Sequence, residues 1–407
     1  MRIFISTGEV SGDLQGSLLV RALKERSRLQ DQDLELVGLG GEKMQGAGLT
    51  LLANTAAIGS VGLTESLRFI LPTWQIQQRV KAYLKENPID LLVLIDYMGP
   101  NLAIANYLRR VYPDLPIVYY IAPQAWIWSP TDKETEQIAA VTDRLLAIFP
   151  GEAEFFQQKG LDVTWVGHPL LDRIAKDAPS REQARQALKL TPDQNVIALL
   201  PASRLQELRY LLPVICEAAR ELQNQLPDVT FLLPISLAAY REQIEATLAQ
   251  YQLNVTLIES RDTLMAIAAA DLAITKSGTV NLEIALLKIP QVIIYRVSPL
   301  TMWVARRVLK FNLPFVSPVN ILLNQKVVPE LLQENATANH IVKESLDLLL
   351  NGDRRQQIHQ DYQTLRQALG EPGVCARAAQ VILEFATKKA GNDPRSSQTS
   401  TDLFVRE

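Results

Sequence analysis

The stretch Lys276-Ser277-Gly278-Thr279-Val280-Asn281-Leu282-Glu283 decides how this chain folds. The apolar run at 271–275 before it is typical of a buried parallel strand, and residues 283–288 are helical in composition. Pro290 ends that helix, and a second apolar strand follows at 291–297. A strand, a turn of small residues and a helix bring free N–H groups to the carboxyl edge of a sheet. This arrangement favours binding of a phosphate group.

Two interpretations of this turn stay open. In the first, the turn holds a phosphate and the two carboxylate oxygens of Glu283 bind a pair of ribose hydroxyls. In the second, Ser277 or Thr279 is the N-cap of the helix and Glu283 is a favourable first-turn acid. The stretch alone supports both interpretations equally.

The composition narrows the class of protein. A chain of 407 residues is long enough for two or three domains, and 47% hydrophobic with 21% charged residues is typical of a globular protein. The net charge of −3 argues against nucleic acid as the main partner. The two cysteines and three histidines are scattered, so neither a disulfide framework nor a metal site is predicted. The absence of a signal-like segment and of a long apolar run predicts a cytoplasmic protein without a membrane span.

The N-terminal half repeats a strand–turn–helix pattern, which is typical of a doubly wound parallel sheet. The turn Gly8-Glu9-Val10-Ser11-Gly12-Asp13 follows the first strand, but its spacing differs from that of a dinucleotide fingerprint. The expected strands are 3–6, 35–38, 89–96, 117–121, 144–149 and 163–166. We therefore predict about six parallel strands in this half.

Asp96 closes the apolar strand at 89–96. The carboxyl ends of parallel strands border the crevice in which α/β proteins bind ligands, so Asp96 is a candidate general base. An acid at this place can equally cap the helix that follows. His168, between Gly167 and Pro169 at the end of this half, is either a structural hydrogen-bonding residue or a ligand contact.

An apolar segment at 58–74 carries more large side chains than one helical face needs. It either seals the core as a loop and short helix, or forms an exposed patch that meets lipid or an acyl chain. The residues of this predicted patch are Val61, Leu63, Leu67, Phe69, Ile70, Leu71 and Trp74.

The strand–turn–helix pattern restarts in the C-terminal half, which predicts a second α/β domain and a cleft between the two domains. The strands expected before the opening stretch are 195–200, 230–234 and 256–258. Arg204 follows the first of them and is placed either to pair with a diphosphate or to form a surface salt bridge.

Residues 300–311 predict an amphipathic helix with a basic face, which lies on an anionic membrane or shields the core. Residues 329–333 are expected to open a helix.

Short motifs occur in a fixed order along the chain. They are Gly8-Glu9-Val10-Ser11-Gly12-Asp13, Gly41…Met44-Gln45…Gly48, Ile95-Asp96, Tyr120…Pro123…Trp126…Trp128, Phe149-Pro150…Glu152, Gly167-His168-Pro169, Leu200-Pro201…Ser203-Arg204, Ser277-Gly278-Thr279…Leu282-Glu283 and Val328…Glu330-Leu331-Leu332-Gln333. Each is weak alone, but together they resemble the lipid-A-disaccharide synthase family of inverting GT-B glycosyltransferases over about residues 2 to 385.

The resemblance implies a fold and a reaction. In the GT-B fold, two doubly wound parallel-sheet α/β domains face a cleft. The implied enzyme transfers 2,3-diacylglucosamine from its UDP donor to the 6-hydroxyl of 2,3-diacylglucosamine 1-phosphate, which yields the β-1,6-linked lipid A disaccharide 1-phosphate and UDP. Since UDP is a good leaving group, one base for the acceptor proton suffices. No cofactor or metal is expected.

The resemblance also implies site residues. Asp96 corresponds to the catalytic base, and the acceptor side of the cleft is lined by Glu9, Ser11 and Asp13. The residues implied for UDP-donor binding are Arg204, Ser277, Gly278, Thr279, Glu283 and Asn320.

Because both implied substrates carry acyl chains, the resemblance favours a lipid-facing patch at 61–74. It implies a cytoplasmic enzyme bound peripherally to the inner leaflet of the inner membrane, and a homodimer with exchanged C-terminal segments. The expected regions are an acceptor-side domain at 1–168, a UDP-sugar domain at 169–365, a helical segment at 366–390 that packs back on the first domain, and a disordered tail at 391–407.

Two positions depart from the family's pattern. Gly99 stands where a second Asp is usual, and Ala202 stands where a glycine is usual before Ser203-Arg204. Two alternatives therefore stay open: another UDP-sugar GT-B enzyme, such as a UDP-N-acetylglucosamine epimerase or a peptidoglycan-type transferase, and an inactive UDP-sugar-binding protein. The joint presence of Asp96, Arg204 and Glu283 favours an enzyme.

Overall fold

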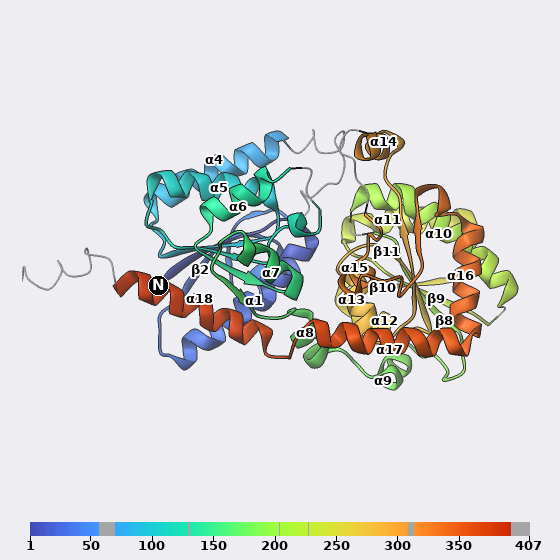
Figure 1. The fold of residues 1–407 in the computed structure, drawn as a ribbon. Coiled ribbons are helices and arrows are strands. Elements are labelled where there is room, and N and C mark those ends of the chain that lie inside the picture. Colours follow the sequence, from blue (N-terminus) through green and yellow to red (C-terminus); the bar gives the residue numbers. More distant parts are fainter. Residues whose placement is uncertain (57–69, 129–130, 203, 227, 308–312, 392–407) are drawn as a thin grey trace, which may run out of the picture. The chain divides into compact units, whose positions relative to one another are not determined.

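The computed structural model describes residues 1–56, 70–128, 131–202, 204–226, 228–307 and 313–391 (Figure 1). These residues form two compact units. The first unit contains the described residues up to Pro169 and returns at Glu371, and the second unit spans Leu170–Gly370. The predicted tail at 391–407 lies outside the described residues except for Gly391.

The first unit is built on a parallel sheet of seven strands in the order β3-β2-β1-β4-β5-β6-β7. The strands are β1 (Arg2–Ser6), β2 (Glu35–Gly40), β3 (Thr50–Asn54), β4 (Leu91–Ile95), β5 (Ile117–Tyr120), β6 (Arg144–Ala147) and β7 (Val163–Trp165). The sequence predicted about six strands and missed β3. That strand is only half-buried at the edge of the sheet, so its sequence lacks the continuous apolar run of a central strand.

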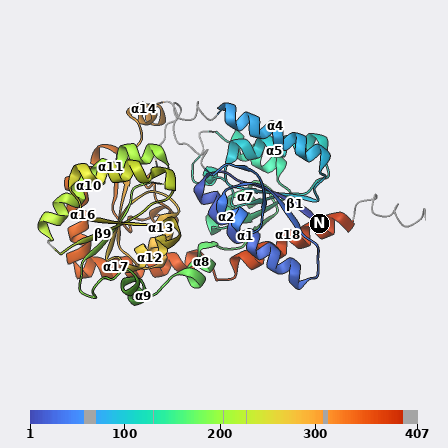
Figure 2. The same ribbon diagram turned by 180° about the vertical axis from the view of Figure 1, so that it is seen from behind.

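Helices cover both faces of the first sheet (Figures 1 and 2). They are α1 (Glu9–Leu29), α2 (Glu42–Gly46), α4 (Ile70–Glu86), α5 (Met98–Val111), α6 (Lys133–Val141), α7 (Pro150–Gln158) and α18 (Val374–Gly391). Helices α4, α5 and α6 pack on one another and contribute Val80, Leu108 and Ile138 to one apolar cluster with the strands. Helix α1 packs against α18.

The C-terminal helix α18 belongs to the first unit although the second unit precedes it in the chain. Nε and Nη2 of Arg377 donate to the carbonyl oxygen of Val166, at 3.2 and 2.8 Å. The Arg144 guanidinium lies 5.7 Å from the centre of the Phe385 ring. The first unit is therefore assembled from both ends of the chain.

The second unit contains a parallel sheet of six strands in the order β10-β9-β8-β11-β12-β13. The strands are β8 (Val196–Leu200), β9 (Thr230–Pro234), β10 (Val255–Ile258), β11 (Leu272–Lys276), β12 (Gln291–Tyr295) and β13 (Glu330–Leu332). The prediction that 329–333 opens a helix is wrong, because Glu330–Leu332 pairs with the free edge of β12. A run of three residues is too short for periodicity to separate a strand from a helix.

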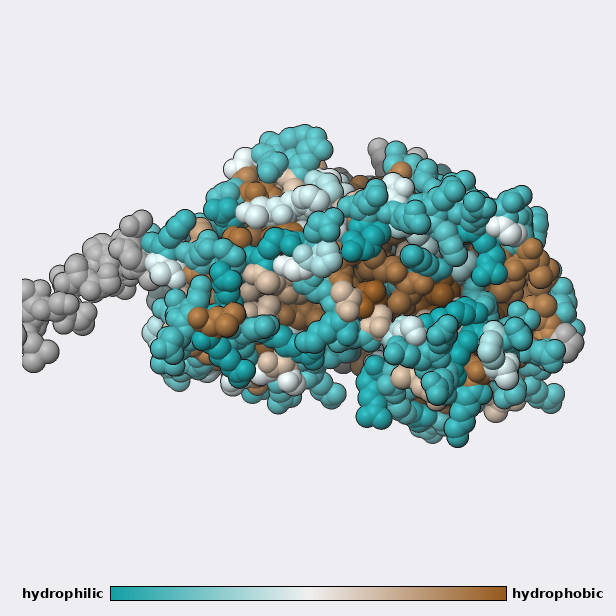
Figure 3. Space-filling view, turned by 90° about the horizontal axis from the view of Figure 1, so that it is seen from below, coloured by the Kyte–Doolittle hydropathy of each residue, from teal (hydrophilic) through white to brown (hydrophobic). Residues whose placement is uncertain are grey.

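The helices of the second unit alternate with its strands. They are α8 (Leu170–Asp177), α9 (Arg181–Ala187), α10 (Leu205–Gln225), α11 (Arg241–Tyr251), α12 (Thr263–Ala269), α13 (Val280–Leu286), α14 (Pro299–Arg307), α15 (Pro318–Leu323), α16 (Ala338–Leu350) and α17 (Gly352–Ala368). The helix predicted at 283–288 begins three residues earlier, at Val280. Strands and helices both contribute buried apolar side chains to the core. The face drawn in Figure 3 is mostly hydrophilic, with smaller apolar patches. The predicted class, two doubly wound parallel-sheet α/β domains, is confirmed.

The spacing between β1 and β2 gives a stability prediction. A Cβ atom on Gly38 in β2 would lie 1.8 Å from the backbone oxygen of Ile5 in β1, so the strands must move apart. We expect Gly38→Ala to cost at least about 1–3 kcal/mol in a thermal or denaturant unfolding experiment. Gly46→Ala is the matched control, since a Cβ there meets nothing within 4 Å and alanine favours the helix. Equal melting temperatures of the two variants would contradict this strand spacing.

Candidate functional site

Each sheet reverses its strand order once, and the predicted site residues follow the strands at these two points. In the first unit, β1 and β4 are neighbours, and they lead into the turn at 8–13 and into Asp96. The turn predicted at 8–13 consists of Gly8 and the first helical residues of α1, which already begins at Glu9. In the second unit, β8 and β11 are neighbours, and they lead into Arg204 and the turn at 277–279. Ligands of doubly wound proteins bind outside the carboxyl ends of the strands where the order reverses. Each unit therefore has one candidate site.

Asp96 stands in a backbone conformation that is uncommon for residues other than glycine. Its φ is 45° and that of Tyr97 is 51°, both in the left-handed region. The Asp96 carbonyl oxygen accepts from Asn101 Nδ2 at 2.6 Å and from Tyr119 Oη at 2.9 Å, and its N–H donates to the Ile121 carbonyl at 2.9 Å. Residues held in such conformations cluster at functional sites, because the surrounding structure must fix them. The backbone of Asp96 is thus set before any ligand binds.

The turn after β1 is joined to the turn that carries Asp96. Burial, and then the negative charge of Glu9, raise the pKa of the Tyr97 phenol. A Cβ on Gly8 would lie 2.5 Å from the Tyr97 ring, so a glycine is needed there. Glu9 has a φ of 62°, and Glu9 and Ser11 are half-buried. The segment that carries Glu9 and Ser11 therefore packs beside Tyr97, the residue that follows Asp96.

The Asp13 side chain is buried and hydrogen-bonded to backbone N–H groups. Only 4% of it is exposed. Its carboxylate accepts from the N–H groups of Gly41 at 2.8 Å, Met44 at 3.0 Å and Lys43 at 3.1 Å. Asp13 therefore fixes the start of α2, and it acts on the site through the position of the turn at 8–13.

Glu152, for which the sequence predicted no role, fixes the backbone after β5 and β6. It is 1% exposed, and its Oε1 accepts from the N–H of Ala122 at 2.8 Å. Its Oε2 accepts from the N–H groups of Ile148 at 2.8 Å and Phe149 at 3.2 Å. Burial raises the pKa of Glu152 to about 7, although the hydrogen bonds from these three N–H groups lower it. The signal in the sequence was an acid at the third position of a helix that opens with Pro150.

His168 and the Phe149 ring pack together, with ring centres 5.2 Å apart. His168 is 2% exposed, and burial lowers its pKa to about 3, so the imidazole is neutral near pH 7. Its surroundings are those of a core residue at the end of the first unit.

In the second unit, two cations meet one carboxylate at the ends of β8 and β11. Arg204 is the N-cap of α10, and its Nη1 lies 3.2 Å from Glu207 Oε1. The Arg204 N–H donates to Glu207 Oε2 at 3.1 Å. Lys276 Nζ lies 3.6 Å from the same Glu207 Oε1. Neither Glu207 nor Lys276 was predicted as a site residue, because their proximity depends on the pairing of two strands whose partner residues are 75 positions apart.

The turn at 277–279 is shaped by hydrogen bonds that the sequence did not reveal. Ser277 Oγ donates to the Val316 carbonyl at 2.8 Å, and the Gly278 N–H donates to Asn281 Oδ1 at 2.8 Å. Thr279 is the N-cap of α13, but its side chain makes no capping hydrogen bond. The prediction that Ser277 or Thr279 is the N-cap of this helix is therefore confirmed for Thr279, although its hydroxyl makes no capping hydrogen bond. Gly278 has a φ of 154°, which a residue with a side chain rarely adopts.

Glu283 and Asn320 are both buried and both have protein partners. Glu283 is 5% exposed and forms an ion pair with Arg173 of α8. Asn320 is fully buried, and its Nδ2 donates to the Val328 carbonyl at 2.9 Å and to Glu330 Oε1 at 2.8 Å. Its Oδ1 accepts from the N–H groups at 327 and 328. Asn320 therefore organises the loop between α15 and β13.

Part of the predicted apolar patch is exposed. Val61, Leu63, Leu67 and Phe69 lie outside the described residues. Ile70, Leu71 and Trp74 at the start of α4 are 61%, 62% and 57% exposed, so these three do not seal the core. On α14, Leu300 and Trp303 are also more than half exposed, so these two do not shield the core either.

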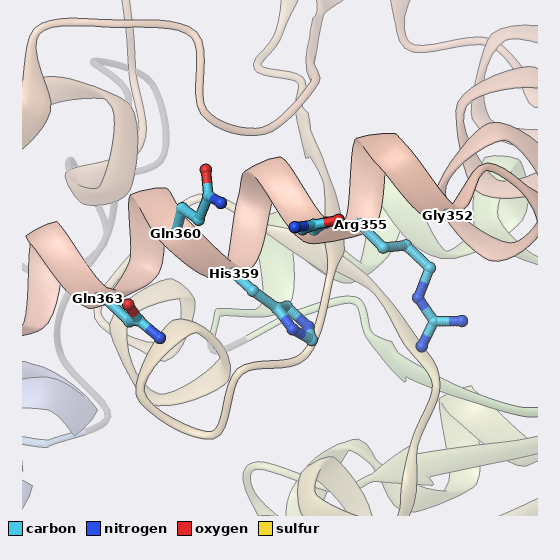
Figure 4. Close-up of a pocket in the computed structure, with 6 residues that line it drawn as sticks. Gly352, Arg355, His359, Gln360 and Gln363 are labelled. Atoms are coloured by element: carbon cyan, nitrogen blue, oxygen red, sulfur yellow. The ribbon is translucent and has the colours of Figure 1, made fainter.

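A hollow of about 620 Å³ lies along α17 (Figure 4). Its lining residues are Gly352, Arg355, Gln356, His359, Gln360 and Gln363. Burial, followed by the charge of Arg355, lowers the pKa of His359. None of the predicted site residues lines this hollow, and we assign it no role in the reaction.

Comparison with known proteins gives one consistent family. A family profile described as lipid-A-disaccharide synthetase matches residues 3–385. The chain is 75% identical to the lipid-A-disaccharide synthase of Synechocystis sp. over 95% of this chain and 98% of that protein. It is 58% identical to the enzyme of the same name from Gloeothece citriformis, over 95% of this chain and all of that protein.

Solved structures show the fold alone. A putative UDP-N-acetylglucosamine 2-epimerase from Listeria monocytogenes superposes with a TM-score of 0.64 at 16% identity, covering 93% of this chain and 94% of that one. The glycosyltransferase of kitacinnamycin superposes with a TM-score of 0.60 at 15% identity, covering 94% and 98%. These likenesses support the GT-B fold class predicted from the sequence.

Glu152 gives a pH-dependent stability prediction. Its pKa in the folded protein is about 7, against 4.5 for an exposed glutamate, so between these values the native state binds more protons than the unfolded chain. Stability from this group is complete below pH 4.5 and is lost as the pH rises through 7. Relative to Glu152→Gln, the wild type should therefore lose roughly 3 kcal/mol of unfolding free energy across this range. Denaturant unfolding at several pH values measures it, and parallel pH profiles of the two proteins would contradict it.

Proposed function

This chain belongs to the lipid-A-disaccharide synthetase family, and we propose how its residues carry out that family's glycosyl transfer. The family match over residues 3–385 supports the assignment most strongly. The reaction transfers 2,3-diacylglucosamine from its UDP donor to 2,3-diacylglucosamine 1-phosphate, with release of UDP. The alternatives left open by the sequence, another UDP-sugar enzyme or an inactive binder, are not favoured, because the chain is 75% identical to a lipid-A-disaccharide synthase, whereas the epimerase likeness is one of fold only.

We assign Asp96 as the base that takes the proton from the acceptor 6-hydroxyl. It follows β4 at the reversal point of the first sheet, and its backbone is held by three hydrogen bonds in a left-handed conformation. A fixed carboxylate loses little freedom when the acceptor binds, which favours proton transfer. Glu9 and Ser11 border the acceptor, and Asp13 holds their turn in place.

The UDP donor binds the second unit in this proposal. Its predicted residues are Arg204, Ser277, Gly278, Thr279, Glu283 and Asn320. Glu283, already fixed by Arg173, offers its carboxylate to the ribose hydroxyls, and Asn320 shapes the adjoining loop. Helix α13 has only seven residues, so its dipole is small. The negative charge of the leaving diphosphate is therefore stabilised mainly by Arg204.

We further propose that the protein binds the cytoplasmic face of the inner membrane peripherally. Within the described residues, no helix is both long enough and apolar enough to cross a bilayer. Ile70, Leu71 and Trp74 present an exposed apolar surface at the start of α4, which suits insertion among lipid headgroups and acyl chains. The acyl chains of both substrates require access to such a surface.

Replacing the proposed base tests the assignment of Asp96. Asp96→Asn keeps the shape of the side chain but cannot accept the proton. Turnover should fall by about 10²–10⁴-fold, with UDP affinity nearly unchanged. Release of UDP and formation of disaccharide from both acylated substrates are followed together, and circular dichroism confirms folding. Asp114→Asn, an exposed acid of the same unit, is the control.

A folded Asp96→Asn enzyme that keeps more than half of the wild-type rate would exclude Asp96 as the base. A wild type that binds UDP but turns over neither substrate would support the inactive-binder alternative instead.

Replacing Ile70, Leu71 and Trp74 with serine tests the membrane contact. Co-sedimentation with anionic liposomes should fall by about tenfold or more, because full burial of even one such side chain contributes about 1.5–3 kcal/mol. The melting temperature should stay near that of the wild type, since the three side chains are already exposed. Leu29→Ser with Val111→Ser, two exposed apolar positions of the same unit, is the matched control. A large loss of thermal stability would show instead that the three residues belong to the core.

A further inference from the structure

We propose that Lys276 is a second cation for the donor diphosphate, held beside Arg204 by the shared carboxylate of Glu207. This inference rests on the proposed donor site of the second unit. It gives a role to Lys276, which begins the stretch quoted first from the sequence but was assigned no function there.

The position of Lys276 follows from strand pairing. Thr275 of β11 pairs with Leu200 of β8, so Lys276 and the residues after Leu200 leave the sheet side by side. Arg204, which follows β8, and Lys276, the last residue of β11, therefore contact the same Glu207 carboxylate. This is the edge at which the sheet reverses its order and at which the donor is proposed to bind.

The three side chains are largely removed from water. Lys276 is 13% exposed, Glu207 14% and Arg204 24%. Two of the three side chains are cations, and the negative charge of a diphosphate that binds beside them would interact favourably with both.

The Lys276 side chain folds over its own turn. A Cβ on Gly278 would lie 2.7 Å from Lys276 Nζ, so the ammonium group lies directly above the Gly278 backbone. Gly278 is one of the residues predicted to bind the donor. The ammonium group is thus already within the proposed diphosphate region, and its three N–H donors suit phosphate oxygens.

The contact of Lys276 with Glu207 is looser than that of Arg204. Glu207 receives two hydrogen bonds from Arg204, at 3.1 and 3.2 Å, whereas Lys276 Nζ stays at 3.6 Å. Glu207 therefore keeps both hydrogen bonds from Arg204 if Lys276 turns toward a phosphate. The opposing interpretation is that Lys276 only neutralises Glu207.

The nucleotide series UDP, UMP and uridine separates these two roles by calorimetry on the full chain. Lys276→Met should weaken UDP about ten- to a hundredfold, UMP less, and uridine not at all. Lys276→Arg, which keeps the charge, should restore most of the UDP affinity. Lys343→Met, an exposed lysine of α16, is the control and should bind all three ligands as the wild type does.

Arg204→Met distinguishes the failure of this inference from failure of the donor site. If Arg204→Met weakens UDP and Lys276→Met does not, Lys276 is only a partner of Glu207 and the inference is overturned. If UDP affinity is unchanged in both variants, the proposed donor site itself is wrong.

A measurement on the wild-type sequence covers the case in which Lys276→Met does not fold. Lysines are dimethylated with ¹³C-formaldehyde, which preserves their charge, and the Lys276 signal is identified by its absence in Lys276→Arg. Addition of UDP should shift this signal, and addition of uridine should leave it in place. An unchanged signal at saturating UDP would overturn the inference.

Discussion

The pairing of β1 with β4 and of β8 with β11 is the constraint on which both candidate sites depend. Parallel strands that are neighbours end at the same edge, so any residues that follow them are brought together whatever their distance in sequence. In the first unit this pairing joins the turn at 8–13 to Asp96. In the second it joins Arg204 to Lys276. The chemistry of each unit is thus placed by backbone hydrogen bonds before any side chain contributes.

Buried polar side chains then fix the loops that leave these strands. Asp13, Asn101, Glu152 and Asn320 each bind backbone groups of a loop that has no ladder of its own. A buried polar side chain without hydrogen-bond partners would be costly, so each of these four residues stays bonded to its loop. These hydrogen bonds hold the loop in a single arrangement. Asn101 shows the principle well, since it also accepts from Ser6 Oγ and so joins the ends of β1 and β4. Hydrogen bonds from buried side chains therefore hold the loops of the two sites in place.

The sequence predicted the elements that rest on local pattern. The central strands are continuous apolar runs, and the glycine turns after them mark where the chain bends. The edge strands β3 and β13 were not predicted, because their residues gain strand structure from a neighbour and not from their own periodicity. For the same reason the roles of Glu152, Glu207 and Lys276 could not be predicted. Glu283 was placed correctly at the start of a helix, but its partner Arg173 lies 110 residues earlier and left no local signal.

The order in which the two units can finish folding follows from the return of α18 to the first unit. Residues 170–370 are contiguous, whereas the first unit also needs Arg377 to reach back to Val166. During synthesis from the N-terminus, the second unit is complete before the first has received its last helix. Until then the face of α1 that α18 covers is open to solvent on the nascent chain. The half of the protein that is translated first is therefore the half that finishes folding last.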